Sequence, residues 1–161
     1  MKMILSRLCC LTIFFLFEVS AISAPQPSSI PKHFNAYIGG FMGVSYKVEL
    51  REGILTYTVW QNPSNQKATT ITPTETQWHE FRQTLDELKI WQWRGNYPNK
   101  NVKDGTQWSI DIIYADRVLK TKGDNSYPDD AGKPNGKPEP TEVFNRYLSA
   151  VQKLMGGKTF R

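Results

Sequence analysis

Cysteine is nearly absent from this 161-residue chain, which has only Cys9 and Cys10, both in an apolar stretch near the N-terminus. Without that stretch the chain holds no thiol, which excludes disulfides, Cys-ligated zinc and a cysteine nucleophile. Such a domain depends on its hydrophobic core alone. A chain of about 140 residues buries roughly two-thirds of its unfolded surface, so a core of that kind is feasible.

Histidine is almost as scarce, and the common catalytic motifs are missing. The two histidines are His33 and His79, and His79 lies off the apolar stripe of a predicted helix, so we expect it to face solvent. No nucleophile elbow, phosphate-binding glycine loop or zinc-protease motif occurs. The sequence therefore predicts no catalytic residue. A paired-carboxylate enzyme remains open as the alternative.

Aspartates gather in the second half, but their spacing does not suit a metal. Asp124, Asp129 and Asp130 lack the alternating positions of a calcium loop. Lys133 and Lys137 lie close to them and would oppose a bound cation. We therefore predict no metal site and no cofactor.

The N-terminus has the pattern of an export signal. Lys2 and Arg7 precede an apolar run at residues 8–17, which is too short to span a bilayer, and small residues follow at 19–21. We expect residues 1–21 to be a signal peptide and residues 22–40 a proline-rich leader. The mature protein is then periplasmic or secreted, without a membrane span. An uncleaved anchor is the alternative.

Residues 41–161 are predicted to form a single α+β domain. Apolar–polar alternation and turn residues predict strands at residues 42–50, 54–61, 68–71, 108–112 and 117–122. Two helices are expected after capping threonines, the first at Thr72 and the second at Thr141. The economical architecture is an antiparallel sheet of four to five strands with both helices packed on one face.

The charge balance is mildly basic. The formal net charge is +5, and loss of Lys2, Arg7 and Glu18 with the signal would lower it by one. This favours a partner with an acidic surface, but it is too small for a nucleic-acid-binding domain. The five tryptophans could stack on bases or sugars, but in a domain without disulfides we expect them in the core.

Residues 123–140 make a long polar connection between the last predicted strand and the second helix. Loops beyond about 12–15 residues are usually functional or disordered. Ala131 is the only aliphatic side chain in residues 129–140, so we expect that part to contribute little to stability. Lys133 and Lys137 would offer positive charge to an acidic partner.

Two short motifs border the predicted hairpin at 108–122. The ends of a hairpin away from its turn lie together, so residues 104–108 and 123–128 should be neighbours. Asn125 can hydrogen-bond the backbone, and Tyr127 can pack beside Trp108. The cluster either closes the end of the sheet or forms part of a binding surface. The candidate binding residues are Asp104, Trp108, Asn125, Tyr127, Lys133 and Lys137.

These motifs carry a resemblance to known proteins. W-x-W at 91–93, Tyr97, D-G-x-x-W at 104–108 and G-x-N-x-Y-P at 123–128 resemble a family of small uncharacterised bacterial proteins. The resemblance covers roughly residues 72–157 and implies that the motifs form one unit with a helix on each side. It implies a bacterial periplasm as the destination and leaves the activity open.

The combined features predict a small exported binding protein without catalytic activity. The grounds are the export signal, the small size, the lack of a catalytic group, and a long polar loop beside aromatic residues. Inhibitors and immunity proteins that act on another protein fit this description. The alternatives are a carboxylate-dependent enzyme of the cell wall or of glycans, and a passive envelope component.

Overall fold

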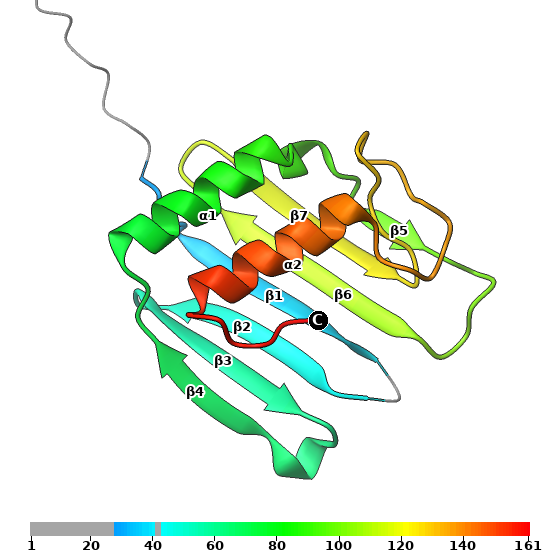
Figure 1. Ribbon diagram of the computed structural model, residues 1–161, viewed down its shortest axis with the longest axis horizontal. Coiled ribbons are helices and arrows are strands. Elements are labelled where there is room, and N and C mark those ends of the chain that lie inside the picture. Colours follow the sequence, from blue (N-terminus) through cyan, green and yellow to red (C-terminus); the bar gives the residue numbers. More distant parts are fainter. Residues whose placement is uncertain (1–27, 41–42) are drawn as a thin grey trace, which may run out of the picture.

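The fold places two α-helices on one face of a single mixed β-sheet (Figure 1). The computed structural model describes residues 28–40 and 43–161, so the predicted signal peptide lies outside the described residues. The predicted α+β class is confirmed. The prediction of four to five antiparallel strands is wrong, because the sheet has seven strands and one pair of them is parallel.

The first four strands of the sheet form a meander, and the last three extend the sheet beyond its first strand. In chain order the strands are β1 (His33–Gly40), β2 (Ser45–Arg51), β3 (Ile54–Trp60), β4 (Lys67–Ile71), β5 (Asn96–Pro98), β6 (Thr106–Ile113) and β7 (Val118–Asp124). Across the sheet they run β4-β3-β2-β1-β6-β7-β5. Only β5 and β7 are parallel, and every other neighbouring pair is antiparallel.

The central strand, β1, occupies residues that the sequence assigned to the leader. Phe34, Ala36 and Ile38 are buried, whereas Asn35 and Tyr37 between them are half-buried. The strand pairs with β2 on one side and with β6 on the other. The leader boundary at residue 40 therefore needs correction, because the sheet already begins at His33.

The remaining unpredicted strand is β5, a three-residue segment that forms the edge of the sheet next to β7. Two hydrogen bonds from β7 hold the residues just before β5. The Thr121 hydroxyl donates to the Arg94 carbonyl at 2.6 Å, and the Lys122 N–H donates to the Gly95 carbonyl at 3.2 Å. So short a strand leaves no period-two pattern in the sequence.

Helix α1 (Glu75–Glu87) begins two residues later than predicted. Thr74, not Thr72, is the cap: its hydroxyl accepts from the Gln77 N–H at 3.2 Å, and the Gln77 side chain accepts from the Thr74 N–H at 2.8 Å. This reciprocal pair satisfies two otherwise free donors of the first turn. The predicted apolar stripe is confirmed, since Trp78, Phe81 and Leu85 are buried.

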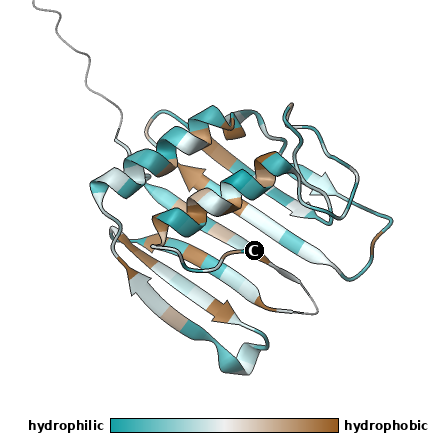
Figure 2. Ribbon diagram, in the orientation of Figure 1, coloured by the Kyte–Doolittle hydropathy of each residue, from teal (hydrophilic) through white to brown (hydrophobic). Residues whose placement is uncertain are grey.

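Helix α2 (Glu142–Leu154) begins at its predicted cap, Thr141, whose hydroxyl accepts from the Phe144 N–H at 3.2 Å. The core lies between the helices and the sheet, where Phe34 meets Phe81 with ring centroids 5.2 Å apart and Trp108 meets Phe144 at 4.8 Å. Figure 2 shows hydrophobic residues alternating with hydrophilic ones along the strands. Each large apolar side chain buried here contributes roughly 1.5–3 kcal/mol.

The C-terminal residues cover part of the helix side of the sheet beyond α2. Phe160 is buried and packs against Tyr46 of β2 at 6.4 Å, and the Tyr57 hydroxyl of β3 donates to the Thr159 carbonyl at 2.8 Å. The helix side is therefore closed over β2 and β3 as well. Across residues 28–40 and 43–161, neither helix has the length and apolar character to cross a membrane.

Candidate functional site

Trp108, at the centre of the motif cluster, lies in the core. Its side chain is 2% exposed and stacks on Tyr127, which is 1% exposed, with ring centroids 6.3 Å apart and planes 14° from parallel. The indole N–H donates to the Ser126 carbonyl at 3.0 Å. Trp108 thus joins β6 to the loop that follows β7.

Gly123 is required because Trp108 lies against its backbone. The two residues are directly paired between β6 and β7. A Cβ atom at residue 123 would come within 2.3 Å of the indole ring, far inside van der Waals contact. Any side chain at this position would displace the indole from its stack.

Asn125 closes the same end of the sheet. Its backbone has a φ of 49°, which asparagine tolerates better than most residues. Its side-chain oxygen accepts from the Thr106 N–H at 2.9 Å, and its amide group donates to the Asp124 carboxylate at 2.7 Å. A Cβ atom on Gly105 would overlap that oxygen. The predicted contact between residues 104–108 and 123–128 is therefore confirmed.

The first part of the long loop is held by hydrogen bonds. The Tyr97 hydroxyl donates to the Gly132 carbonyl at 2.7 Å, and the Asn135 side chain accepts from the Tyr127 N–H at 3.0 Å. The Asp129 carboxylate accepts from the Lys133 N–H at 2.7 Å. The expectation that residues 129–140 contribute little needs correction for residues 129–135, because polar contacts fix them where apolar burial does not.

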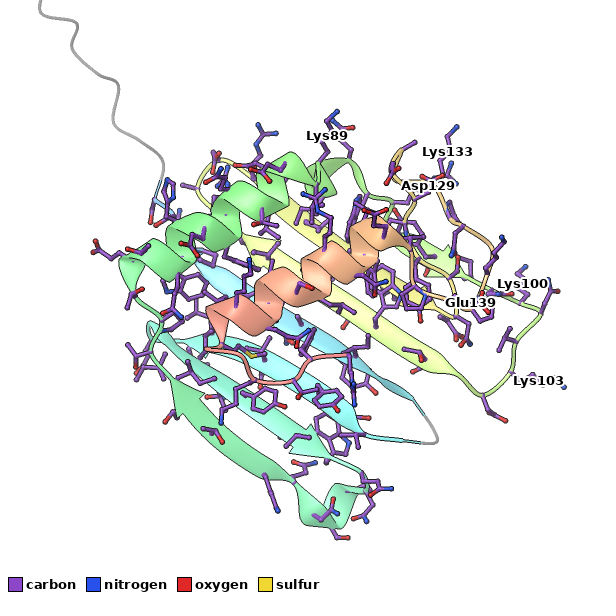
Figure 3. All side chains as sticks on the ribbon, in the orientation of Figure 1. Lys89, Lys100, Lys103, Asp129, Lys133 and Glu139 are labelled. Atoms are coloured by element: carbon purple, nitrogen blue, oxygen red, sulfur yellow. The ribbon has the colours of Figure 1, made fainter. Side chains whose placement is uncertain are left out.

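The six candidate binding residues divide into two groups. Trp108, Asn125 and Tyr127 are buried and have no surface to offer a partner. The other three, Asp104, Lys133 and Lys137, are exposed. Figure 3 shows that Lys133 lies with Asp129 at the outer end of the long loop.

A second accessible surface, besides these exposed loop residues, is the side of the sheet that carries no helix. We call it the open face. Sequence reasoning did not single it out: most of its residues are alternate positions of predicted strands, but Asn35 and Tyr37 lie on β1, which was not predicted. Its central residues are Asn35, Tyr37, Lys47, Glu49, Thr58, Trp60, Ser109, Asp111, Lys120 and Lys122.

Two aromatic residues of the open face lie side by side, one on the central strand β1 and one at the end of β3. Tyr37 of β1 and Trp60 of β3 stack across β2, with ring centroids 6.0 Å apart and planes 25° from parallel. Both are half-buried. They line a hollow of about 530 Å³ together with Asn35, Thr58 and Ser109. That volume lies within the usual range of ligand sites, about 300–1,000 Å³.

One group of charged side chains beside the aromatic pair lies along β2 and consists of Lys47, Glu49 and Arg51. Glu49 lies 3.0 Å from Lys47 and 3.5 Å from Arg51. Burial alone would raise the pKa of Glu49, but the hydrogen bond and charge of Lys47, with the charge of Arg51, lower that pKa below its ordinary value. Glu49 is therefore ionised at neutral pH.

A second charged group follows β6 and β7, where Asp111 lies 3.8 Å from Lys120 and 3.9 Å from His33. In both groups the cation extends further into solvent than the carboxylate. Arg51 and Lys120 are 74% and 84% exposed, against 22% for Glu49 and 33% for Asp111. A molecule approaching the open face meets positive charge first.

The Arg82 ion-pair cluster serves the structure and lies on the helix side. Its guanidinium donates two hydrogen bonds to Asp116, at 2.8 and 3.0 Å, and one to Asp86 at 2.9 Å. It also lies over the rings of Tyr114 and Trp91. Hydrogen bonding to Arg82 lowers the pKa of Asp116. This cluster fastens α1 to the turn between β6 and β7.

The two histidines lie on different elements of the fold. His33 lies on β1 beside Asp111, whereas His79 is exposed on α1. Burial raises the pKa of Tyr114 and of Tyr147, and both are core residues. Within residues 28–40 and 43–161, no group of three His, Cys, Asp or Glu side chains could hold a metal ion.

No protein-family model matches the chain, and a search of curated proteins finds no match either.

Proposed function

We propose that this protein is an exported, non-catalytic binding protein that holds an acidic surface of another protein against its open face. The observation that carries the proposal is the stacked pair of Tyr37 and Trp60, bordered by ion pairs whose cations extend into solvent. Inhibitors and immunity proteins are the classes that this arrangement fits.

The aromatic pair supports a protein partner. The residues that contribute most to binding in protein interfaces are enriched in tryptophan, tyrosine and arginine and lie near the middle of the contact, with a polar rim around them. Tyr37 lies on the central strand, and Trp60 lies two strands away on the same face. The charged residues of β2, β6 and β7 lie on that face beside them.

The charge arrangement supports an acidic partner. Arg51 and Lys120 are far more exposed than the carboxylates that pair with them. Charges exposed in this way mainly accelerate association, and salt screens them over about 8–10 Å. Binding should therefore be salt-dependent, chiefly through the association rate.

The carboxylates of the open face argue against the enzyme alternative. A carboxylate-dependent glycosidase needs one acid whose pKa is raised enough to stay protonated near neutral pH. The pKa of Glu49 is lowered instead. Asp111 is held in an ion pair with Lys120, at 3.8 Å.

The test requires a partner first and variants second. Cross-linking in envelope extract, followed by mass spectrometry, identifies a partner, which is then purified and titrated against the wild-type protein and its variants. Trp60→Ala should weaken binding by about tenfold or more, as loss of an aromatic residue that dominates a protein interface does. Lys120→Glu should slow association. The matched control is Lys153→Glu, the same charge change at an exposed position of α2.

Three results would overturn the proposal. Unchanged affinity in both open-face variants would place the binding surface elsewhere. An equal effect of Lys153→Glu would show only a response to net charge. Turnover of peptidoglycan fragments by the purified protein, or preference for an acidic polysaccharide over any protein, would replace the proposed class.

A further inference from the structure

The two edges of the sheet are built differently. At one edge, β5 has only three residues and ends in Pro98, which cannot donate a ladder hydrogen bond. At the other edge, β4 has five residues without proline, and all but Ile71 are exposed. Figure 1 shows β4 lying beyond the area that the helices cover. Exposed edge strands usually carry a blocking device, because their free backbone groups accept another strand.

The turn before β3 fixes which backbone groups face outward. Glu52 and Gly53 have φ angles of 51° and 81°, the values of a two-residue hairpin turn, so Arg51 and Ile54 form a hydrogen-bonded pair. Alternation then directs the N–H and C=O groups of Leu55 away from β2 and toward β4.

The same alternation continues into β4. Leu55 is paired with Ile71, and Tyr57 with Thr69, so the backbone groups of Ile71 and Thr69 bond to β3. The N–H and C=O groups of Ala68 and Thr70 therefore point outward from the sheet. This edge offers two donors and two acceptors, with no proline among them.

We propose that two copies of this chain join through β4, antiparallel and related by a two-fold axis at Thr69, to make one continuous sheet. In this register Ala68 of each copy lies opposite Thr70 of the other copy, which makes two equivalent pairs. Both residues have outward backbone groups, so each of these pairs exchanges two N–H···O bonds. The edge is complementary to itself in this register, as a symmetric two-fold contact requires.

The side chains agree with the same register. Lys67, the only charged residue of β4, lies opposite Ile71 of the second copy, so no lysine faces a lysine. The lysine stem can cover the half-buried Ile71 while its ammonium stays in water. Thr69 lies beside Thr69, a favourable cross-strand pair. These features favour a second copy over an unrelated strand.

A five-residue contact of this kind gives a weak, reversible dimer. A two-fold axis perpendicular to the sheet keeps both open faces on the same side, so the dimer would present two of them together. This last consequence depends on the proposed function, but the dimer does not. A protein that dimerises and binds no partner would refute only the proposed function.

Thr70 provides a clean test. Thr70→Pro removes an outward N–H but none of the bonds between β3 and β4. Thr70→Val keeps the N–H and the preference for a strand, so it is the matched control. Sedimentation velocity from micromolar to millimolar concentration should show a monomer–dimer equilibrium for the wild type and Thr70→Val. Thr70→Pro should dimerise about tenfold more weakly or worse, a loss of about 1.4 kcal/mol, with its thermal midpoint checked separately.

Amide hydrogen exchange gives a second measurement that identifies the contact. Protection of the Ala68 and Thr70 N–H groups should increase with protein concentration, whereas the Thr69 N–H, already bonded to β3, should not change. A wild type that stays monomeric throughout would overturn the proposal. A dimer that Thr70→Pro leaves intact, or that forms without protection of Ala68 and Thr70, would also overturn it.

Discussion

Replacing Trp108 with alanine should destabilise the whole domain, because the indole connects three parts of the fold. Its ring centroid lies 5.5 Å from Tyr97, 6.3 Å from Tyr127 and 4.8 Å from Phe144. Those partners belong to β5, the long loop and α2. The substitution therefore removes one side of an aromatic cluster at the end of the sheet.

The magnitude has two parts. Truncating a fully buried tryptophan or phenylalanine to alanine costs roughly 3–5 kcal/mol through lost transfer energy and the cavity that remains. The Ser126 carbonyl also loses its indole donor, which adds about 1 kcal/mol where water cannot replace it. The expected total of about 4–6 kcal/mol is comparable to the entire stability of a small domain, about 5–15 kcal/mol.

Urea unfolding followed by far-UV circular dichroism measures this loss, and Trp108→Phe separates the two parts. Phenylalanine retains most of the ring contacts but no N–H, so it should lose less than half as much. Gly123→Ala should destabilise the wild type, because its Cβ atom would meet the indole at 2.3 Å. In the Trp108→Ala background the same change should cost much less. Wild-type stability of Trp108→Ala, or equal costs of Gly123→Ala in both backgrounds, would refute this reasoning.

Two further predictions concern the helix side and the long loop. Protonation of Asp116 should favour unfolding, because Arg82 lowers the pKa of Asp116 in the folded state. The ion pair therefore stabilises the fold fully above the ordinary aspartate pKa of about 4, and this stabilisation is lost as the pH falls through the lowered pKa. Acid titration of unfolding free energy should therefore be flatter for Asp116→Asn than for the wild type. Asn135→Ala should cost about 1–2 kcal/mol in urea unfolding, because the Tyr127 N–H loses its acceptor, whereas Lys137→Ala at an exposed position should be neutral. A neutral Asn135→Ala would contradict the assigned role of the loop.

The strands with clear alternation could be predicted from the sequence, and β1 could not. In β2, valine and tyrosine alternate with lysine and glutamate, which is a strong period-two pattern. In β1 the buried positions include Ala36, and the strand ends in Gly39 and Gly40, so its contrast is weak. It also follows a proline-rich stretch, which favoured the interpretation as a leader.

Local sequence also did not decide which threonine caps α1, nor which surface of the protein is open to a partner. Thr72 and Thr74 flank Pro73, and either threonine could cap a helix; Gln77, which reaches back to Thr74, decided between them. The neighbourhood of Trp108 and Tyr127 followed from hairpin geometry, but their burial depends on α2. The open face could not be located before the position of both helices was known.

The central position of β1 has a consequence for how the chain acquires its structure. Its hydrogen-bonding partner β6 pairs with it along the full strand, from His33 with Ile113 to Gly40 with Thr106. Residues 41–105 must therefore be synthesised before the first strand can complete its pairing. Contacts between segments so far apart in the sequence slow the search for the native state. Until β6 arrives, the meander of β1 to β4 exposes a second free edge, so the nascent chain is most exposed to misassembly during this interval.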